Sequence, residues 1–267
     1  MEPANILEIS HLNIEFHDHE QPETVVEDLT LQVRAGEILG IVGESGSGKT
    51  MTALAVAGLL NRKDMEKSGE IRFRGQDLLS CGRKELREIQ GKDIAMIFQE
   101  PMTSLNPVRK IGWQIEESLR LHTDLDKKER KKRALKLMEE VELAPEVYDK
   151  YPHELSGGMR QRVMIAAAMI CDPVLLIADE PTTALDVTIQ EQIIELLLRL
   201  NREKKTAMLF ISHDLSLVRK LCGRVVVMES GKMVEEGLTK EIFDHPTEAY
   251  TRKLIGAIPT IERGKRR

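Results

Sequence analysis

Three short, continuous apolar segments stand out along the chain, and each is followed at once by glycine or polar residues. They are Ile38 to Val42, Val174 to Ala178 and Met208 to Ile211. Uninterrupted apolar runs of this length are typical of parallel strands that are buried on both faces. In open α/β sheets, ligands bind at the edge formed by the carboxyl ends of such strands. We therefore expect the residues that follow the three runs to lie near one another.

Other segments alternate loosely between apolar and polar positions. Residues Glu8 to Phe16 and Thr24 to Val33 show this pattern before the first apolar run. It predicts antiparallel strands with one face in water. Near the far end, Val225 to Met228 and Met233-Val234 flank a Ser230-Gly231 turn. This arrangement predicts a β-hairpin.

The middle of the chain has helical periodicity between about Pro101 and Leu155. Apolar residues recur there at spacings of three and four, namely Ile111, Ile115 and Leu119 on one face and Leu135, Met138 and Val141 on another. We interpret this stretch as a helical subdomain inserted into an α/β core. The expected organisation is one domain over residues 1–267, with a core of residues 1–100 and 170–267 and a helical subdomain of residues 101–169.

Composition and charge exclude several classes of protein. The 39 Lys and Arg against 44 Asp and Glu give a net charge of -5, which does not favour a nucleic-acid-binding face. The basic run Asp126 to Arg133 fits a solvated helical face better than a binding patch. The three cysteines have no paired spacing, which argues against a disulfide framework or a zinc site.

No signal peptide and no apolar run of about 18 residues is expected from the sequence, so any work at a membrane would require a partner. The basic end, Ile261 to Arg267, is expected to fray.

The first apolar run leads into a phosphate-binding sequence. Gly43-Glu44-Ser45-Gly46-Ser47-Gly48-Lys49-Thr50 matches the pattern G-x-x-x-x-G-K-[ST]. In this pattern backbone N–H groups surround phosphates, the lysine neutralises their oxygens and the hydroxyl binds Mg²⁺. The pattern needs a strand before it and a helix after it. The first apolar run supplies the strand, and a helix is expected to begin near Lys49 and to include Thr52 to Leu60. ATP and Mg²⁺ are therefore the expected ligands.

Two adjacent carboxylates, Asp179 and Glu180, close the second apolar run. A carboxylate pair at a strand end is common as a helix cap. Beside a phosphate loop, however, Asp179 is expected to hold Mg²⁺ and Glu180 to orient and deprotonate the attacking water.

A third site candidate, Leu155-Ser156-Gly157-Gly158, precedes the apolar segment Val163 to Ile170. Its local pattern is that of a helix N-terminus, where free N–H groups favour an anion. By local physics alone Ser156 is simply the N-cap of that helix. Gln99 and His213, each after an apolar run, are equally unremarkable when taken alone.

Taken in order, these motifs resemble those of the ATP-binding cassette (ABC) ATPases over nearly the whole chain. Leu155 to Gln161 is similar to the signature motif of that family, which implies that Ser156, Gly157, Gly158 and Gln161 contact a nucleotide held by another subunit. By the same resemblance, Gln99 corresponds to the Q-loop residue that senses Mg²⁺ and the γ-phosphate, Asp186 to the D-loop, and His213 to the switch histidine. Phe16 is the candidate for stacking on adenine, although the family more often has tyrosine and core packing is nearly as consistent. The implied fold is an ABC-type nucleotide-binding domain: a RecA-like core with an antiparallel β subdomain and an inserted helical subdomain.

Two longer stretches, Met96 to Ile115 and Glu241 to Leu254, resemble the importer branch for oligopeptides, dipeptides and nickel. The resemblance implies an ATP-hydrolysing subunit at the cytoplasmic face of the membrane, bound to two permease subunits and to a second ATPase chain, with a heterodimer favoured over a homodimer. An extracytoplasmic binding protein would deliver the cargo. Peptide-importer members usually continue into a cysteine-containing tail, and its absence here shifts the expected cargo toward nickel or a metal chelate.

Two alternatives remain at this point. A soluble ABC protein of DNA repair or translation would be expected to contain a coiled coil or a second cassette, and neither is present in the sequence. A regulatory ATPase of the family that is not coupled to transport is the other alternative. The intact Glu180 and Ser156 favour turnover.

Overall fold

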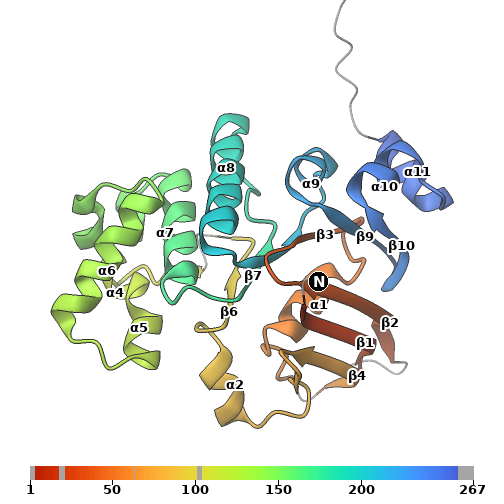
Figure 1. Ribbon diagram of the computed structural model, residues 1–267, viewed down its shortest axis with the longest axis horizontal. Coiled ribbons are helices and arrows are strands. Elements are labelled where there is room, and N and C mark those ends of the chain that lie inside the picture. Colours follow the sequence, from red (N-terminus) through yellow and green to blue (C-terminus); the bar gives the residue numbers. More distant parts are fainter. Residues whose placement is uncertain (1–3, 18–21, 63, 101–103, 258–267) are drawn as a thin grey trace, which may run out of the picture.

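The computed structural model describes residues 4–17, 22–62, 64–100 and 104–257. Its strands form two sheets, one of six strands and one of four. Figure 1 shows a lobe of helices at one end, the larger sheet in the middle, and the antiparallel sheet and the C-terminal helices on the opposite side. The mixed α/β fold class expected from the sequence is confirmed. The predicted fraying of residues 261–267 lies outside the described residues.

The six-stranded sheet has the order β10-β9-β3-β8-β7-β6. Its strands are β3 (Ile38–Val42), β6 (Ile94–Ile97), β7 (Leu175–Asp179), β8 (Ala207–Ile211), β9 (Arg224–Glu229) and β10 (Lys232–Leu238). All neighbours are parallel except the hairpin β9–β10, which is antiparallel. The three apolar runs thus correspond to adjacent strands, β3, β8 and β7, and every residue of these strands is buried. Their uninterrupted apolar character reflects burial on both faces.

The four-stranded sheet is antiparallel and has the order β2-β1-β4-β5. Its strands are β1 (Asn5–Phe16), β2 (Glu23–Arg34), β4 (Met65–Phe73) and β5 (Gln76–Asp77). The first two confirm the predicted alternating strands. Strand β4 was not predicted, because most of its residues are polar and exposed, and only Ile71 and Phe73 are buried. Cross-strand pairing with β1, rather than its own pattern, makes this segment a strand.

The helices mostly cover the larger sheet or form the separate lobe. They are α1 (Lys49–Val56), α2 (Arg83–Ile89), α4 (Ile111–Ile115), α5 (Glu117–His122), α6 (Lys127–Glu140), α7 (Gly157–Met169), α8 (Val187–Lys204), α9 (Leu215–Leu221), α10 (Thr239–Asp244) and α11 (Ala249–Gly256), with short 3₁₀ turns η1 (Pro145–Asp149) and η2 (Pro152–Glu154). Helix α1 starts at Lys49 as expected but ends before Leu60. The reason is Gly58, which has a φ of 67° and ends the helix in the left-handed conformation that glycine tolerates.

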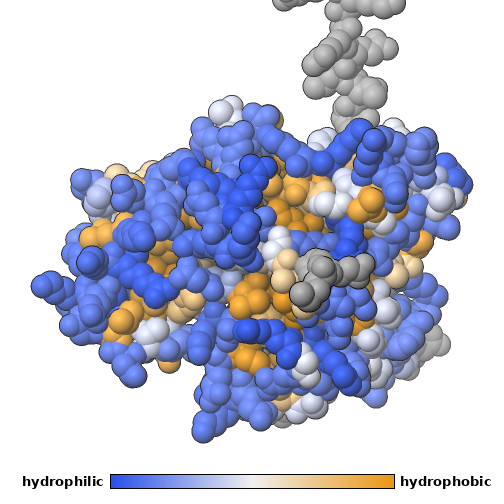
Figure 2. Space-filling model, in the orientation of Figure 1, coloured by the Kyte–Doolittle hydropathy of each residue, from blue (hydrophilic) through white to orange (hydrophobic). Residues whose placement is uncertain are grey.

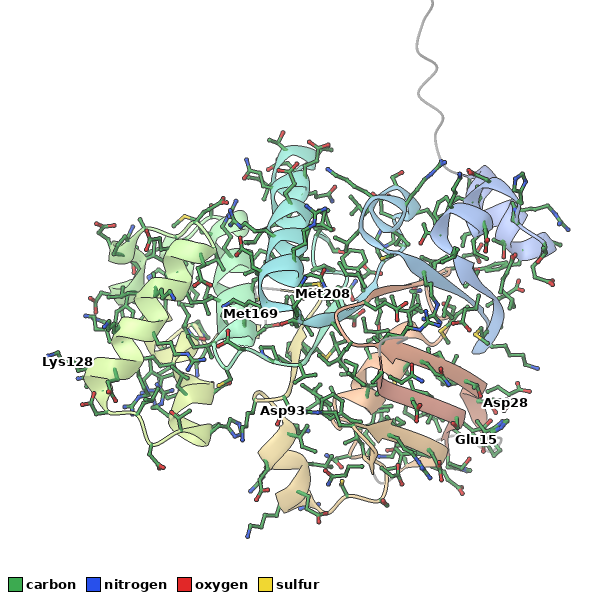
Figure 3. The ribbon with its side chains drawn as sticks, viewed as in Figure 1. Glu15, Asp28, Asp93, Lys128, Met169 and Met208 are labelled. Atoms are coloured by element: carbon green, nitrogen blue, oxygen red, sulfur yellow. The ribbon has the colours of Figure 1, made fainter. Side chains whose placement is uncertain are left out.

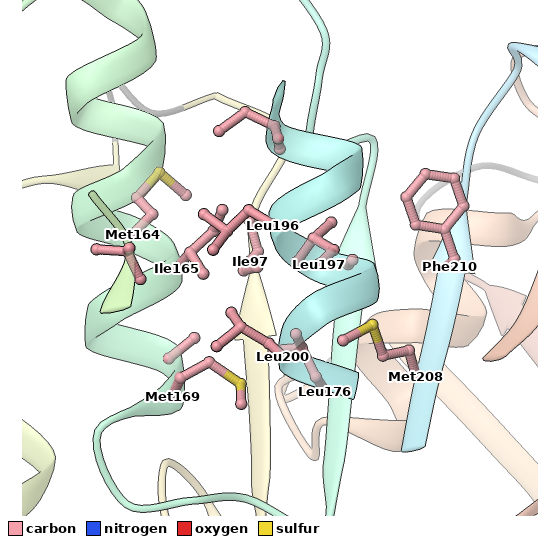
Figure 4. Close-up of a cluster of buried hydrophobic side chains, with 14 of the residues drawn as sticks. Ile97, Met164, Ile165, Met169, Leu176, Leu196, Leu197, Leu200, Met208 and Phe210 are labelled. Carbon is pink, nitrogen blue, oxygen red and sulfur yellow. The ribbon is translucent and has the colours of Figure 1, made fainter. Parts of the chain in front are cut away.

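Helix α7 connects the helical lobe to the sheet. It packs against α4 and α6 on one side and against β6 and α8 on the other. Figure 4 shows the shared core, where Met164, Ile165 and Met169 of α7 face side chains of α8, β6 and β7. All the residues labelled there are at most 6% exposed. The lobe and the sheet therefore share one continuous apolar cluster.

The face seen in Figure 2 is mainly hydrophilic, with separate apolar patches, including one near its middle. Charged side chains such as Lys128 lie at the periphery, whereas Met169 and Met208 lie in the interior (Figure 3). The basic run around Lys128 forms the exposed face of α6, capped by Asp126, as predicted. Within the described ranges, no helix combines the length and apolar character needed to cross a membrane.

Candidate functional site

The phosphate loop connects β3 to α1 at the centre of the molecule. Glu44, Ser45 and Gly46 form its exposed part, whereas Ser47, Gly48 and Lys49 are buried. Two positions require glycine. A Cβ on Gly43 would lie 2.2 Å from the carbonyl oxygen of Met228, and one on Gly48, which has a φ of 94°, would lie 2.6 Å from that of Val25. The loop is thus held tightly against the two sheets at Gly43 and Gly48, where there is no space for a side chain.

The Lys49 ammonium lies inside the loop. Its Nζ donates to the carbonyl oxygens of Gly43 at 2.9 Å and Glu44 at 2.8 Å, and to the Ser47 hydroxyl at 3.2 Å. Burial lowers the pKa of Lys49, while the carboxylates of Glu180 and Asp179 act in the opposite direction. A cation with donors directed into a loop of backbone amides is suited to phosphate oxygens.

Asp179, the last residue of β7, faces the start of α1. The Thr50 hydroxyl donates to Asp179 Oδ1 at 3.3 Å, which links the phosphate loop to the end of β7. Asp179 is only 2% exposed, and burial raises its pKa to about 6, although the Thr50 hydrogen bond acts to lower it. Two hard oxygen donors, one of them an incompletely compensated carboxylate, fit a Mg²⁺ ion that is also bound to phosphates.

We expect Asp179→Asn to stabilise the free protein at neutral pH. Because the folded-state pKa lies above the unfolded value, the ionised Asp179 costs the folded state free energy above pH 6, and this cost decreases as the pH falls toward 4. The variant should gain up to about 3 kcal/mol of unfolding free energy at pH 7.5 and almost nothing near pH 4. Denaturant titrations at both values, with EDTA and without nucleotide, measure this difference. An equal gain at both pH values would contradict the explanation.

Glu180 is the point where three segments of the chain meet, those that follow β6, β7 and β8. Its Oε2 accepts from Gln99 Nε2 at 3.0 Å and from the Thr183 hydroxyl at 2.9 Å, and its Oε1 lies 3.0 Å from His213 Nδ1. Burial tends to raise the pKa of Glu180, but the hydrogen bonds from His213 and Thr183 outweigh it and lower the pKa. Glu180 also has a φ of 46°, a conformation that costs a non-glycine residue free energy. The carboxylate is therefore held in one orientation.

Gln99 and His213 reach Glu180 from different strands. Gln99 lies two residues beyond the end of β6, and His213 two residues beyond the end of β8, on either side of β7. The prediction that the residues following the apolar runs would gather at one edge is thus met by Asp179, Glu180 and His213. The His213 side chain remains 65% exposed, so it can still reach a ligand.

The segment expected to be the signature motif begins helix α7. Ser156 is its N-cap, and the Ser156 hydroxyl accepts from the Met159 N–H at 3.3 Å. A Cβ on Gly158 would lie 2.8 Å from Ile189 of α8, and one on Gly157 would lie 3.5 Å from Leu185. Only glycine therefore fits at residue 158 with this packing. Ser156 and both glycines lie on an exposed or partly exposed helix end.

Helix α7, which carries this end, packs on different elements from those that contact α1 after the phosphate loop. Helix α7 packs on α4, α6, α8 and β6, whereas α1 packs on β2, β7 and β8. Asp186 lies near the signature segment, as the N-cap of α8, where its Oδ1 accepts from the Ile189 N–H at 3.0 Å. Gln161, in contrast, is only 1% exposed and points into the protein. A nucleotide contact by Gln161 would need a rearrangement, and that role remains a prediction.

Phe16 ends strand β1 on the side of the phosphate loop. It pairs with Glu23 of β2, two residues from Val25, whose carbonyl oxygen lies against Gly48. Its ring is only partly buried, and the Arg62 guanidinium lies 5.0 Å from the ring centroid. One ring face is thus already in a cation–π contact, and the role of Phe16 in base stacking remains a prediction.

Sequence reasoning missed two residues that touch the predicted site. Thr183 donates to Glu180, and the Tyr250 hydroxyl accepts from the backbone N–H of Glu44 at 3.0 Å. Thr183 lies only three residues after Glu180 in the sequence, but this spacing matches no known functional motif. The contact of Tyr250 spans 206 residues, so no local spacing could have revealed it.

Comparison with known protein families supports the expected resemblance. Residues 26–183 match the family model described as ABC transporter. The chain is 48% identical over 264 residues to the dipeptide transport ATP-binding protein DppD of Haemophilus influenzae, covering 98% of this chain and 80% of that protein. It is 46% identical to DppD of Escherichia coli, covering 98% of this chain and 81% of that protein.

Solved structures give the same fold. A dimeric ATP-binding cassette, MJ0796, in a post-hydrolysis state bound to ADP and Pi, aligns with a TM-score of 0.79 and 27% identity, covering 87% of this chain and 98% of that one. The cbiO1 protein of Clostridium perfringens, part of the ABC transporter complex cbiONQ, aligns with a TM-score of 0.76 and 27% identity, covering 90% and 91% of the two chains.

Proposed function

Because the chain belongs to the ABC transporter family, we propose that it is the ATP-hydrolysing subunit of a binding-protein-dependent importer whose cargo is di- or oligopeptides. The relatives with 45% to 48% identity are named as dipeptide or peptide transport and import proteins, which favours peptides over nickel or a metal chelate. The sequence-based preference for a metal cargo rested on a missing cysteine tail alone. The similarity to peptide-import proteins, which covers 98% of this chain and 80% of the Haemophilus influenzae protein, is the stronger indicator.

Nucleotide binding is assigned to the phosphate loop, residues Gly43 to Thr50. Its backbone N–H groups and the Lys49 ammonium would bind the β- and γ-phosphates, and Phe16 would stack on the adenine. Thr50 and Asp179 would hold Mg²⁺, with Gln99 as a further oxygen donor. When bound, the ion neutralises charge that develops on the phosphate oxygens.

The convergence on Glu180 is the observation that carries the catalytic assignment. Three donors hold this carboxylate in place, directly after Asp179 of the proposed metal-binding pair, and this supports a role for Glu180 as the base that would orient water toward a γ-phosphate. Glu180 would accept the proton of the attacking water. Gln99 and His213 would keep the base oriented and, through their exposed parts, respond to the γ-phosphate.

A second cassette would complete the site. The Ser156 hydroxyl, Gly157 and Gly158 form an exposed helix N-terminus suited to the γ-phosphate, but α7 packs on other elements than the phosphate loop does. A head-to-tail dimer, with Asp186 near the interface, would bring Ser156 of one subunit to the phosphate loop of the other. We propose that the second subunit is a related but distinct ATPase chain.

An apolar groove beside Gln99 is suited to a permease subunit. It has a volume of about 280 Å³ and lies between the end of α1, strand β6 and the helical lobe. Leu59 and Phe98, which line it, are 44% and 40% exposed, so the groove presents two large apolar side chains to a partner. Because Phe98 directly precedes Gln99, a partner in the groove would be coupled to Glu180. The subunit would thus act at the cytoplasmic face of the membrane as a peripheral protein.

The test is paired uptake in cells that lack this gene and are rescued by wild type or by Lys49→Ala. We expect loss of labelled dipeptide uptake, restored by wild type but not by the variant, while uptake of radiolabelled nickel is unchanged. Loss of nickel uptake alone would reassign the cargo to a metal. Normal uptake of both would favour the alternative, a regulatory ATPase of the family that is not coupled to transport.

A further inference from the structure

The C-terminal helix α11 makes direct contact with the phosphate loop. The Tyr250 hydroxyl accepts a hydrogen bond from the backbone N–H of Glu44 at 3.0 Å. Lys253, one turn later, lies 3.5 Å from the Glu44 carboxylate, but both side chains are largely exposed, so this ion pair contributes little. The tyrosine is therefore the residue by which α11 fixes the loop.

Helix α11 is itself anchored firmly to strand β10. The Glu235 carboxylate of β10 accepts from the Thr247 N–H at 2.8 Å, from the Thr247 hydroxyl at 2.8 Å and from the Glu248 N–H at 3.2 Å. These three bonds hold the chain at the entry to α11. The Tyr250 ring packs on the main apolar cluster, and Thr251 beside it is only 1% exposed. The hydroxyl of Tyr250 is thus presented to the loop from a rigid base.

The same hairpin supports the loop at a second point. In the turn between β9 and β10, the Gly231 N–H donates to the Ser47 carbonyl oxygen at 3.3 Å. A Cβ on Gly231 would lie 2.8 Å from the Val25 carbonyl oxygen, so the turn is pressed against β2. The phosphate loop is therefore held at Glu44 by α11 and at Ser47 by the turn, on both sides of the exposed Ser45 and Gly46.

We propose that Tyr250 is a positioning residue for nucleotide binding, which sets the conformation of the phosphate loop through the backbone of Glu44. The inference rests on the proposed role of this loop in binding ATP. Phosphate binding by a loop depends on several N–H groups being aimed at once. A hydrogen bond that fixes the first turn of the loop reduces the number of conformations lost on binding, and affinity rises accordingly.

A tyrosine hydroxyl is chemically suited to this position. Burial raises the pKa of Tyr250, whereas the Glu44 N–H acts to lower it, so the group stays a neutral hydroxyl at physiological pH. A carboxylate could accept the same hydrogen bond but would repel the triphosphate nearby. The neutral acceptor orders the loop without adding negative charge.

The test is the variant Tyr250→Phe, which removes one oxygen and keeps the ring. We expect the Kd for a fluorescent ATP analogue and for its ADP counterpart to rise about three- to tenfold, the value of one ordinary hydrogen bond. The KM for ATP should rise in parallel while kcat stays within about twofold of wild type, because Tyr250 contacts neither Glu180 nor its partners. If Tyr250 served only the stability of the fold, Tyr250→Phe would not raise the KM while leaving kcat unchanged.

Tyr148→Phe is the matched control. Tyr148 donates its hydroxyl hydrogen to Glu116 in the helical lobe, and so also loses a hydrogen bond when truncated. The control should lose thermal stability but keep the wild-type Kd. Equal Kd values for Tyr250→Phe and wild type, or the same rise in Tyr148→Phe, would overturn the proposal. A wild-type protein with no saturable nucleotide binding would overturn the assignment of the loop itself, and this inference with it.

Glu235→Ala provides an independent check, because it cuts the anchor of α11 at a distance from the loop. The Kd should rise in the same direction as for Tyr250→Phe. In the Tyr250→Phe background, however, Glu235→Ala should add less than twofold, since the contact it supports is already gone. Full additivity of the two changes would show that α11 does not act through Tyr250.

Discussion

Replacing Glu180 by glutamine is expected to lower ATP turnover by about 10²- to 10⁴-fold while leaving ATP binding intact. Glutamine keeps the size of the side chain and can still contact Gln99, Thr183 and His213, but it cannot accept a proton from water. The expected loss is that of a general base. Phosphate release, measured with the partner subunits present, and the Kd for ATP check the two halves of this prediction.

The matched control for this experiment is Glu191→Gln. Glu191 lies on the exposed face of α8, so its loss should change neither turnover nor affinity. If Glu180→Gln turned over ATP at a rate near that of wild type, the catalytic assignment would be wrong. If it lost ATP binding as well, Glu180 would be a structural support of the loop and not a base.

Lys49→Ala is expected to weaken ATP binding by about a hundredfold or more. Charge-assisted hydrogen bonds contribute about 1.5–3 kcal/mol each, and the buried Lys49 ammonium is the cation inside the loop. Removing it also ends the three bonds to Gly43, Glu44 and Ser47 that hold the loop in shape. Turnover should fall with affinity. Equilibrium titration with a fluorescent ATP analogue measures the effect.

Lys84→Ala serves as the control for the change in charge, because Lys84 is exposed on α2. It should bind nucleotide like wild type. A Kd for Lys49→Ala within threefold of wild type would show that the loop binds phosphate without its lysine. Both variants should keep a melting temperature close to that of wild type, so that a change in Kd is not caused by unfolding. For Lys49→Ala this is expected because burial disfavours the charge that the substitution removes.

Local pattern was enough to find the segments that build the end of the sheet to which we assign nucleotide binding. The run Ile38 to Val42 is β3 with the same bounds, and the strands before Glu180 and His213 differ from expectation by one residue at their ends. Buried parallel strands can be recognised from the sequence because both of their faces must be apolar. The polar strand β4 and the early end of α1 could not be seen in this way, since partner strands and one left-handed glycine determine them.

What the sequence by itself determined is the class of fold, the family and the identity of the phosphate-loop residues, because these depend on residues adjacent in the chain. The strand ends also predicted that Glu180 and His213 lie together, but only the tertiary structure decided that Gln99 and Thr183 bind Glu180, that Gln161 points inward, and that Tyr250 supports Glu44. These contacts join residues up to 206 positions apart. Strand order and helix packing bring these residues together, and neither can be predicted from the spacing of residues along the chain.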